Sequence, residues 1–302
     1  MEKHVKSFVH EPQPEWGGPW TEKKLDAFAK YVKAYLTIMK KNPYWDTIYF
    51  DGFAGSGDRS MKCKNIEVIQ QLEISEQEER LYKGAAERVL SLPNNLIFKY
   101  HYFIDLKEES LNKLEAILLA LPRSRETILE FRSGDCNEKL LELSNAMKNN
   151  KKLVSLVLLD PFGKHINWES IASLKGTKTD IWILIPTGVI VNRLLDKACS
   201  LKHSVKLQSF FGLEEKDIIE YFYKTETQPN LFGEVDDIIT KVNKPIEKIA
   251  TLYASQLKTI WKHVLSKPLI LKNSRGAPIF HFIFASNNES ALRIATDIIK
   301  SG

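Results

Sequence analysis

Aspartates stand at the ends of several apolar segments of this sequence, at Asp51, Asp105, Asp135 and Asp160. An ionised carboxylate only accepts hydrogen bonds, so such a set suits a ligand that presents donors, such as a ribose diol and an adenine amino group. A glycine-rich run at 52–57 follows Asp51 directly, and glycines let the backbone approach a bound molecule closely. Together these residues predict a site for a nucleoside-containing cofactor.

The glycine-rich run is a weak signal by itself, because glycine loops after strands are common. It lacks the Gly-Lys-Ser/Thr of a phosphate-binding loop and the regular dinucleotide fingerprint, which disfavours nucleoside triphosphate hydrolysis. Each aspartate taken alone also has a common structural role, as a turn residue or a helix cap. Only their joint occurrence, one of them beside a glycine loop, favours the cofactor site.

Alternating strands and helices must position these residues. The segment 153–159 is apolar throughout, as expected for a parallel strand covered on both faces. The alternation predicts an α/β fold with a doubly wound, mostly parallel sheet, in which ligands bind beyond the carboxyl ends of the strands. All of the aspartates above fall at that edge. The predicted strands are 47–51, 98–104, 127–131, 153–159 and 181–185, and the predicted helices include 21–40, 108–121, 137–147 and 189–201.

The last third of the chain departs from this alternation. Residues 210–265 have the apolar spacing of helices, which predicts an inserted helical subdomain or lid. Two further strands, 268–271 and 279–285, flank Asn273-Ser274-Arg275-Gly276 and predict a C-terminal antiparallel hairpin. The predicted domains are a Rossmann-like domain at 1–206 and 266–302 and the inserted helical subdomain at 207–265.

The composition of the 302-residue chain is that of a globular protein, with 43% apolar and 27% charged residues. Its apolar runs, such as 153–159, are far shorter than the ~20 residues that span a bilayer, and residues 1–10 carry no signal-like apolar core. Cys63, Cys136 and Cys199 lie far apart without a Cys-x-x-Cys pair, so no disulfide framework or cysteine-based zinc site is encoded. We therefore expect a cytoplasmic protein that does not span a membrane.

The order of the predicted elements, with a hairpin closing the chain, favours S-adenosyl-L-methionine over a nicotinamide as the cofactor. In this interpretation Asp51 and the glycine-rich run hold the methionine part, Asp105 binds the ribose and Asp135 binds the adenine. Asp160 would lie nearest the reacting centre. The candidate cofactor-binding residues are Asp51, Gly52, Ala54, Gly55, Gly57, Asp105, Asp135 and Cys136.

The same positions carry a set of sequence motifs in a fixed order. The motifs are Tyr49 to Gly57, Phe103-Ile104-Asp105, Gly134 to Asn137, Leu158 to Gly163 and Phe284-Ala285-Ser286. This set resembles the three-Cys-motif partner proteins and runs through most of the chain. The resemblance implies a class I S-adenosyl-L-methionine methyltransferase fold. It also implies a partner, a neighbouring protein whose three-cysteine motif is of the radical S-adenosylmethionine type.

The run Asp160-Pro161-Phe162-Gly163 also resembles the Asp-Pro-Pro-Tyr signature of methyltransferases that act on exocyclic amino groups. In that signature the aspartate and a following carbonyl accept hydrogen bonds from the target amine, and the aromatic ring stacks on the base. Here Phe162 replaces the second proline and Gly163 replaces the aromatic residue. The resemblance implies that Asp160 orients an acceptor amine, and it makes Asp160, Pro161 and Phe162 the candidate catalytic residues. Methyl transfer to an amine needs mostly positioning and desolvation. The departure leaves room for a peptide or small-molecule amine as the acceptor.

The charge pattern also leaves the partner open. A net charge of +5 allows a nucleic acid, yet Lys and Arg are spread among nearly as many Asp and Glu. Lys197, Lys202 and Lys206 are the better phosphate-facing candidates, whereas the lysines within 148–152 are expected to form a solvated turn. No interleaving of aromatic and basic residues is evident in the sequence. Three hypotheses remain: a methyltransferase of a nucleic acid or peptide, a non-catalytic or regulatory partner of the cysteine-motif protein, and a nucleic-acid-binding protein without chemistry.

Overall fold

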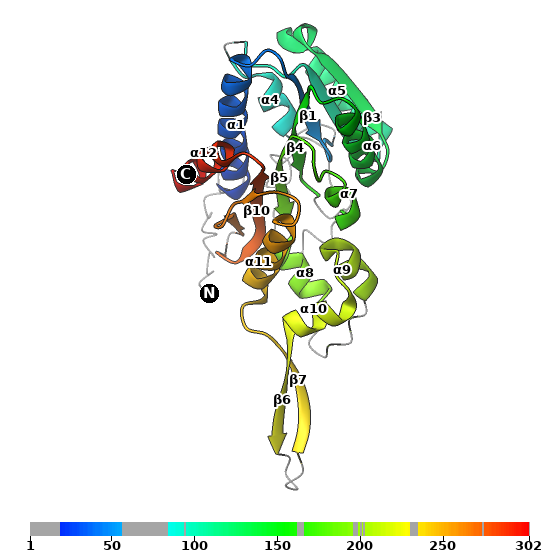
Figure 1. Ribbon diagram of the computed structural model, residues 1–302, viewed down its shortest axis with the longest axis vertical. Helices are drawn as coiled ribbons and strands as arrows, with labels where there is room; N and C mark the ends of the chain where they lie inside the picture. Colours follow the sequence, from blue (N-terminus) through cyan, green and yellow to red (C-terminus); the bar gives the residue numbers. More distant parts are fainter. Residues whose placement is uncertain are drawn as a thin grey trace, which may run out of the picture.

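The computed structural model describes residues 19–55, 84–93, 95–161, 166–195, 199, 201, 203–229, 235–273 and 275–301. Over these residues the chain is an α/β protein built on a mostly parallel central sheet, with a separate antiparallel hairpin (Figure 1). None of the helices within these ranges has the length and apolar character needed to cross a membrane.

The central sheet has the strand order β3-β2-β1-β4-β5-β10-β8, and β9 also pairs with β10. Strands β1 to β5 are parallel to one another, and β10 is antiparallel to β5, β8 and β9. The predictions of a mostly parallel sheet and of a C-terminal hairpin are thus confirmed. The strands are β1 (Asp46–Asp51), β2 (Tyr100–Asp105), β3 (Ile128–Ser133), β4 (Leu153–Leu159), β5 (Thr179–Ile185), β8 (His263–Val264), β9 (Leu269–Lys272) and β10 (Pro278–Ser286).

Helices cover both faces of the sheet, because its central strands are apolar on both sides. Along β4, Leu156 and Leu158 face one core cluster while Val157 and Leu159 face the other. The first cluster is covered by α1 (Pro19–Lys40), α4 (Ala85–Leu90), α5 (Glu108–Leu119) and α12 (Glu289–Lys300). The second is covered by α6 (Cys136–Asn149), α7 (Trp168–Ala172), α8 (Thr187–Arg193) and the helices described below.

Helix α1 is fixed to the sheet by polar contacts as well as by apolar packing. The Tyr31 hydroxyl donates to Asp180 Oδ2 on β5 at 2.6 Å, and the Ser286 hydroxyl on β10 donates to Asp180 Oδ1 at 2.5 Å. The Tyr31 ring also lies 5.5 Å from the fully buried ring of Trp182 and 4.7 Å from that of Phe284. Aromatic pairs at these distances add to the energy of burial, so α1 is an integral part of the core.

The region 207–265 is not purely helical, and its all-helical prediction is wrong in that respect. Between α10 and α11 the chain forms the antiparallel hairpin of β6 and β7, which extends away from the body in Figure 1. Its β-branched residues, such as Thr225 and Ile239, favour strands. Residues 263–264 already belong to the central sheet. The elements are α9 (Ser204–Phe211), α10 (Glu215–Phe222), β6 (Tyr223–Pro229), β7 (Val235–Lys241) and α11 (Pro245–Leu257).

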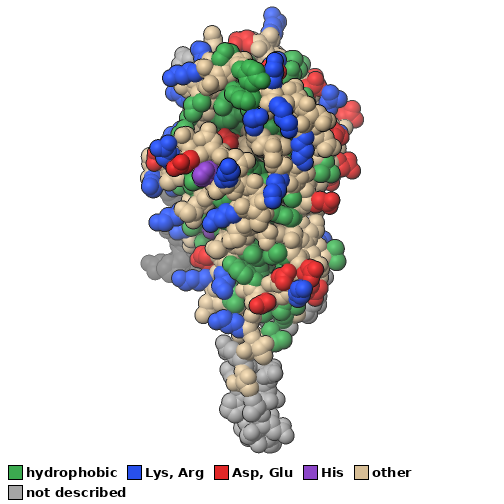
Figure 2. Space-filling view, viewed as in Figure 1, with side chains coloured by type: hydrophobic (Ala, Val, Ile, Leu, Met, Phe, Trp, Pro, Cys, Tyr) green, Lys and Arg blue, Asp and Glu red, His purple; other side chains and the backbone are tan. Residues whose placement is uncertain are grey.

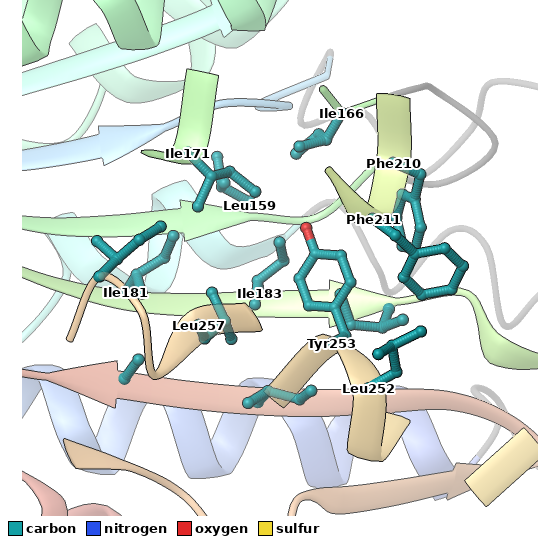
Figure 3. Packing of buried hydrophobic residues seen from close by; sticks show 14 of the residues in the cluster. Leu159, Ile166, Ile171, Ile181, Ile183, Phe210, Phe211, Leu252, Tyr253 and Leu257 are labelled. Carbon is teal, nitrogen blue, oxygen red and sulfur yellow. The ribbon is translucent and has the colours of Figure 1, made fainter. Parts of the chain in front are cut away.

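The helices of this region pack on the sheet itself. Phe211 of α9 and Tyr253 of α11 lie in the same buried cluster as Leu159 and Ile183 of the sheet, as Figure 3 shows. Helix α9 ends at Gly212 in the left-handed conformation (φ 66°), and a Cβ there would come within 2.0 Å of the Trp168 ring. This packing joins α9 and α11 to the central sheet through one continuous core.

Candidate functional site

A cavity of about 240 Å³ lies beyond the carboxyl ends of the parallel strands. Its wall is built from the loops that follow β1, β2 and β3, together with Asn167 at the start of α7. Of the predicted cofactor-binding residues, the structure brings Gly52, Asp135 and Cys136 together on this wall. The complete lining is Gly52, Phe53, Leu106, Gly134, Asp135, Cys136, Asn137 and Asn167.

The aspartates at the end of β1, at the end of β2 and just after β3 share one local geometry. Each carboxylate accepts a hydrogen bond from the backbone N–H two residues later, and this bond fixes the turn that leaves the strand. The bonds join Asp51 to Phe53 N at 3.3 Å, Asp105 to Lys107 N at 2.9 Å and Asp135 to Asn137 N at 2.6 Å. The turn and cap roles considered for these aspartates are therefore real, and Asp135 also faces the cavity while it caps α6.

Gly52 is required by packing against helix α6. A Cβ at this position would lie 2.5 Å from Cys136 Sγ and 2.7 Å from Leu159 Cδ2, which is closer than atoms can approach. Gly55 adopts a left-handed conformation with φ 64°, which favours glycine. The Ala54 N–H donates to the Ile104 carbonyl at 2.9 Å and so ties this loop to β2. The loop after β1 is thereby held against the cavity, whereas Gly57 lies outside the described residues.

The rest of this wall consists of residues that are not among the predicted site residues: Phe53, Leu106, Gly134, Asn137 and Asn167. Leu106 follows Asp105 directly and is 57% exposed, so it presents an apolar surface beside the cavity. Asn137 is held by its own hydrogen bonds, because its Oδ1 accepts from the Asn167 N–H at 2.8 Å. The position of Leu106, a large apolar residue immediately after a strand-end aspartate, could have indicated from the sequence that it belongs to the site.

The predicted catalytic residue Asp160 lies at the end of β4 in an ion pair with Lys24 of α1. The Lys24 ammonium donates to Asp160 Oδ2 at 2.5 Å, and the two residues are only 1% and 4% exposed. Charge-assisted hydrogen bonds of this kind are short and strong. Lys24 shares the apolar face of α1 with Phe28 and Tyr31, both buried, at the four- and seven-residue spacing of a helix. A lysine on an apolar helix face was the signal that could have revealed this pair.

Asp51 lies close enough to this ion pair to interact with both of its charges. Its Oδ2 accepts a hydrogen bond from the buried Tyr49 hydroxyl at 3.0 Å. Burial raises the pKa of Asp51 to about 7, although the bonds from Tyr49 and Phe53 act in the opposite direction. Burial likewise raises the pKa of Asp160 to about 6 against the effect of Lys24, and it lowers the pKa of Lys24. Two carboxylates and one ammonium thus share one buried site.

The remaining predicted positions are only partly covered by the structure. Pro161 follows Asp160 and is buried, whereas Phe162 lies outside the described residues. Lys197 and Lys202 also fall outside them, and Lys206 is exposed on α9. Within the described ranges, no group of three or more His, Cys, Asp or Glu side chains is arranged to hold a metal ion.

We expect Asp51→Asn to raise the stability of the protein at neutral and higher pH. The folded-state pKa of about 7 exceeds the ordinary 3.8, so the free energy of unfolding falls as the pH rises from about 4 to 7. An asparagine cannot ionise, so it removes this pH-dependent loss of stability, which is worth up to about 4 kcal/mol at pH 8. Its side-chain oxygen can still accept the hydrogen bond from the Phe53 N–H. Urea unfolding from pH 4 to 8 measures the difference, which should vanish near pH 4.

The exposed Asp297 of α12 provides the control for this experiment. Asp297→Asn should change the free energy of unfolding by no more than about 0.5 kcal/mol, as is usual for surface positions. An Asp51→Asn profile parallel to that of the wild type would contradict the expectation.

Comparison with known proteins adds no family to these observations. No protein-family model and no curated protein matches the sequence. Conclusions about function therefore come from the sheet, the cavity and the buried charges.

Proposed function

We propose that this protein is an S-adenosyl-L-methionine-dependent methyltransferase that acts on an amino group of a nucleic acid or peptide. The observation that carries the proposal is the cavity at the carboxyl edge of the sheet, where the loops after β1, β2 and β3 meet. Open α/β sheets bind their ligands at this edge, beside the point where the strand order reverses. Here that point lies between β1 and β4. The antiparallel β10 next to β5 agrees with the Rossmann-like methyltransferase fold that the sequence motifs imply.

The polar and apolar groups at the cavity fit an adenosine. Asp135 offers a carboxylate acceptor for the amino edge of an adenine, and the exposed Leu106 offers an apolar surface for its ring. Asp105 directly precedes Leu106 and would accept from the ribose hydroxyls while it keeps its turn bond to Lys107. The loop at Gly52 would adjoin the methionine part. In this assignment each of the strand-end turns contributes to one continuous binding surface.

Asp160 would orient the acceptor amine by accepting a hydrogen bond from one of its N–H groups. The bound cofactor supplies a methyl group on a sulfonium sulfur, and the protein contributes position and exclusion of water. With a pKa of about 6, Asp160 is mainly ionised at neutral pH, and Lys24 favours that ionised form. Lys24 also fixes the direction of the carboxylate through its bond to Oδ2. It therefore acts as a positioning residue in this mechanism.

A second function is supported by the same ion pair. Asp160 is nearly inaccessible and already bonded to a lysine of its own chain. This is the arrangement expected of a subunit that keeps the fold and the cofactor site but serves its cysteine-motif partner without catalysis. This second function would be favoured over the first if the protein bound the cofactor but transferred no methyl group, either alone or together with the partner protein.

We expect Asp105→Asn to weaken the binding of S-adenosyl-L-methionine by about 1 to 3 kcal/mol, which is roughly 5- to 150-fold in Kd. The asparagine oxygen can still accept from the Lys107 N–H, so the turn is kept, but the charge that would bind the ribose diol is lost. Isothermal titration calorimetry measures the affinity, with Asp297→Asn as the control. If the wild-type protein takes up no cofactor at millimolar concentration, the proposed function is abandoned.

A further inference from the structure

A cluster of lysine and aromatic side chains lies at the amino ends of β1, β4 and β5, at the edge of the sheet opposite the cavity. Tyr44 and Trp45 immediately precede β1, Lys151 and Lys152 precede β4, and Lys178 precedes β5. We call these five residues the lysine–aromatic surface. Two further exposed lysines, Lys41 and Lys148, lie close to it along the chain.

The lysines of this surface lie over its aromatic rings. Lys152 Nζ is 5.4 Å from the centre of the Tyr44 ring, and Lys178 Nζ is 4.9 Å from the centre of the Trp45 ring. The Tyr44 and Trp45 rings meet edge to face, with their centres 4.9 Å apart. Lys178 Nζ also donates to the Lys151 carbonyl at 3.1 Å. The cluster is thus one connected group, and its Tyr44 ring remains 61% exposed.

The lysines of this surface carry charges that are not used in ion pairs within the described part of the chain. Among the described residues, no Asp or Glu forms an ion pair with Lys151, Lys152 or Lys178. The carboxylate nearest in sequence to Trp45, Asp46, is paired with Lys99 at 2.7 Å. Figure 2 shows Lys and Arg side chains beside hydrophobic ones in the upper part of the molecule, with some Asp and Glu side chains among them. The surface therefore presents ammonium groups next to an exposed ring.

We infer that the lysine–aromatic surface binds single-stranded nucleic acid. Proteins that bind single strands combine cations along the phosphate backbone with aromatic rings on which unpaired bases stack. Tyr44 offers the ring, Lys152 offers a charge over that ring, and Lys151 and Lys178 offer further charges in the same cluster. A duplex keeps its bases stacked on one another and would use only the charges, so the exposed ring favours a single strand. This inference does not depend on the proposed methyl transfer, because the surface and the cavity lie at opposite edges of the sheet.

Fluorescence anisotropy with a fluorescein-labelled oligouridylate of about twelve nucleotides tests the inference. We expect the wild type to bind and the triple variant Lys151→Gln, Lys152→Gln, Lys178→Gln to lose at least about tenfold in affinity. The slope of log K against log salt should become shallower by about 2, because each phosphate contact to a single strand contributes about 0.7. Tyr44→Ala should lose at least about fivefold, whereas Tyr44→Phe should retain binding.

The exposed lysines 258, 262 and 267 give a control with the same change in net charge. Their triple replacement by glutamine should alter the affinity by less than about twofold. Equal losses in the two triple variants would overturn the inference, since the binding would then follow overall charge. It would also be overturned if the wild type failed to bind the oligonucleotide at low salt, or bound only vesicles that contain an anionic lipid. The oligonucleotide experiment does not depend on whether the protein binds S-adenosyl-L-methionine. Each proposal can therefore be contradicted without affecting the other.

Discussion

Lys24→Met is expected to lower the free energy of unfolding by about 3 to 5 kcal/mol at pH 7. The variant leaves the Asp160 carboxylate buried without its lysine, and an uncompensated buried charge is among the costliest defects in a protein. Methionine has a similar length and fits the apolar face of α1, so the packing loss is small. Urea unfolding followed by circular dichroism measures the change.

The pH dependence of this loss identifies its electrostatic origin. Without Lys24 the pKa of Asp160 rises further, because the lysine is the main group that opposes the effect of burial. At pH 5 the carboxyl group of the variant is then protonated, and the loss should shrink. The double variant Lys24→Met, Asp160→Asn should recover most of the stability at pH 7. Lys23→Met, at the exposed neighbouring position, is the matched control, and a loss equal to that of Lys24→Met would count against the argument.

The second large effect is expected from Asp160→Asn, which should reduce methyl transfer by about a hundredfold or more. Asparagine keeps the shape of the side chain but replaces an ionised acceptor that would orient the amine. Because this contact acts mainly in the transition state, the affinity for S-adenosyl-L-methionine should change by less than about twofold. Transfer of a labelled methyl group to candidate nucleic acids and peptides measures the rate, and calorimetry measures the affinity.

The two readouts separate the possible roles of Asp160. A rate loss with unchanged affinity supports the orienting role, whereas an equal loss of both would place Asp160 in the cofactor site or in the core. Because the variant also removes the partner of Lys24, unfolding must be measured in the same samples. Lys24→Met should reduce the rate as well, and its rate should recover less at low pH than its stability does, since a protonated Asp160 has lost the negative charge that makes it a strong acceptor for the amine.

The fold was largely predictable because its signals are local. The apolar run at β4 and the Asn273 to Gly276 turn specify a central strand and a hairpin through residues that are adjacent in the chain. The strand-end aspartates were found for the same reason. The β6–β7 hairpin was missed because the spacing of apolar residues in 210–265 fits helices over most of that region.

The site was less predictable because its decisive contacts join distant segments. The partner of Asp160 lies 136 residues earlier in the chain. It is one lysine among many charged residues of a helix, so its burial can be recognised only from the helical face on which it lies. Likewise Tyr44 and Trp45 are brought beside Lys151, Lys152 and Lys178 only by the pairing of β1, β4 and β5. The aromatic and basic residues of this surface are therefore neighbours in the fold but not in the sequence, where no interleaving of the two kinds is visible.

The attachment of α1 also has a consequence for the order in which the molecule forms. Its contacts to Asp160, Asp180 and Trp182 all lie more than a hundred residues downstream. During synthesis the helix leaves the ribosome before β4 and β5, yet part of the surface that receives it exists only after those strands have been made. Contacts of such long sequence separation form late because closing the intervening loop costs entropy. A nascent chain that stops before β5 would carry α1 with part of its apolar face uncovered, and such a surface is a target for chaperones and proteases.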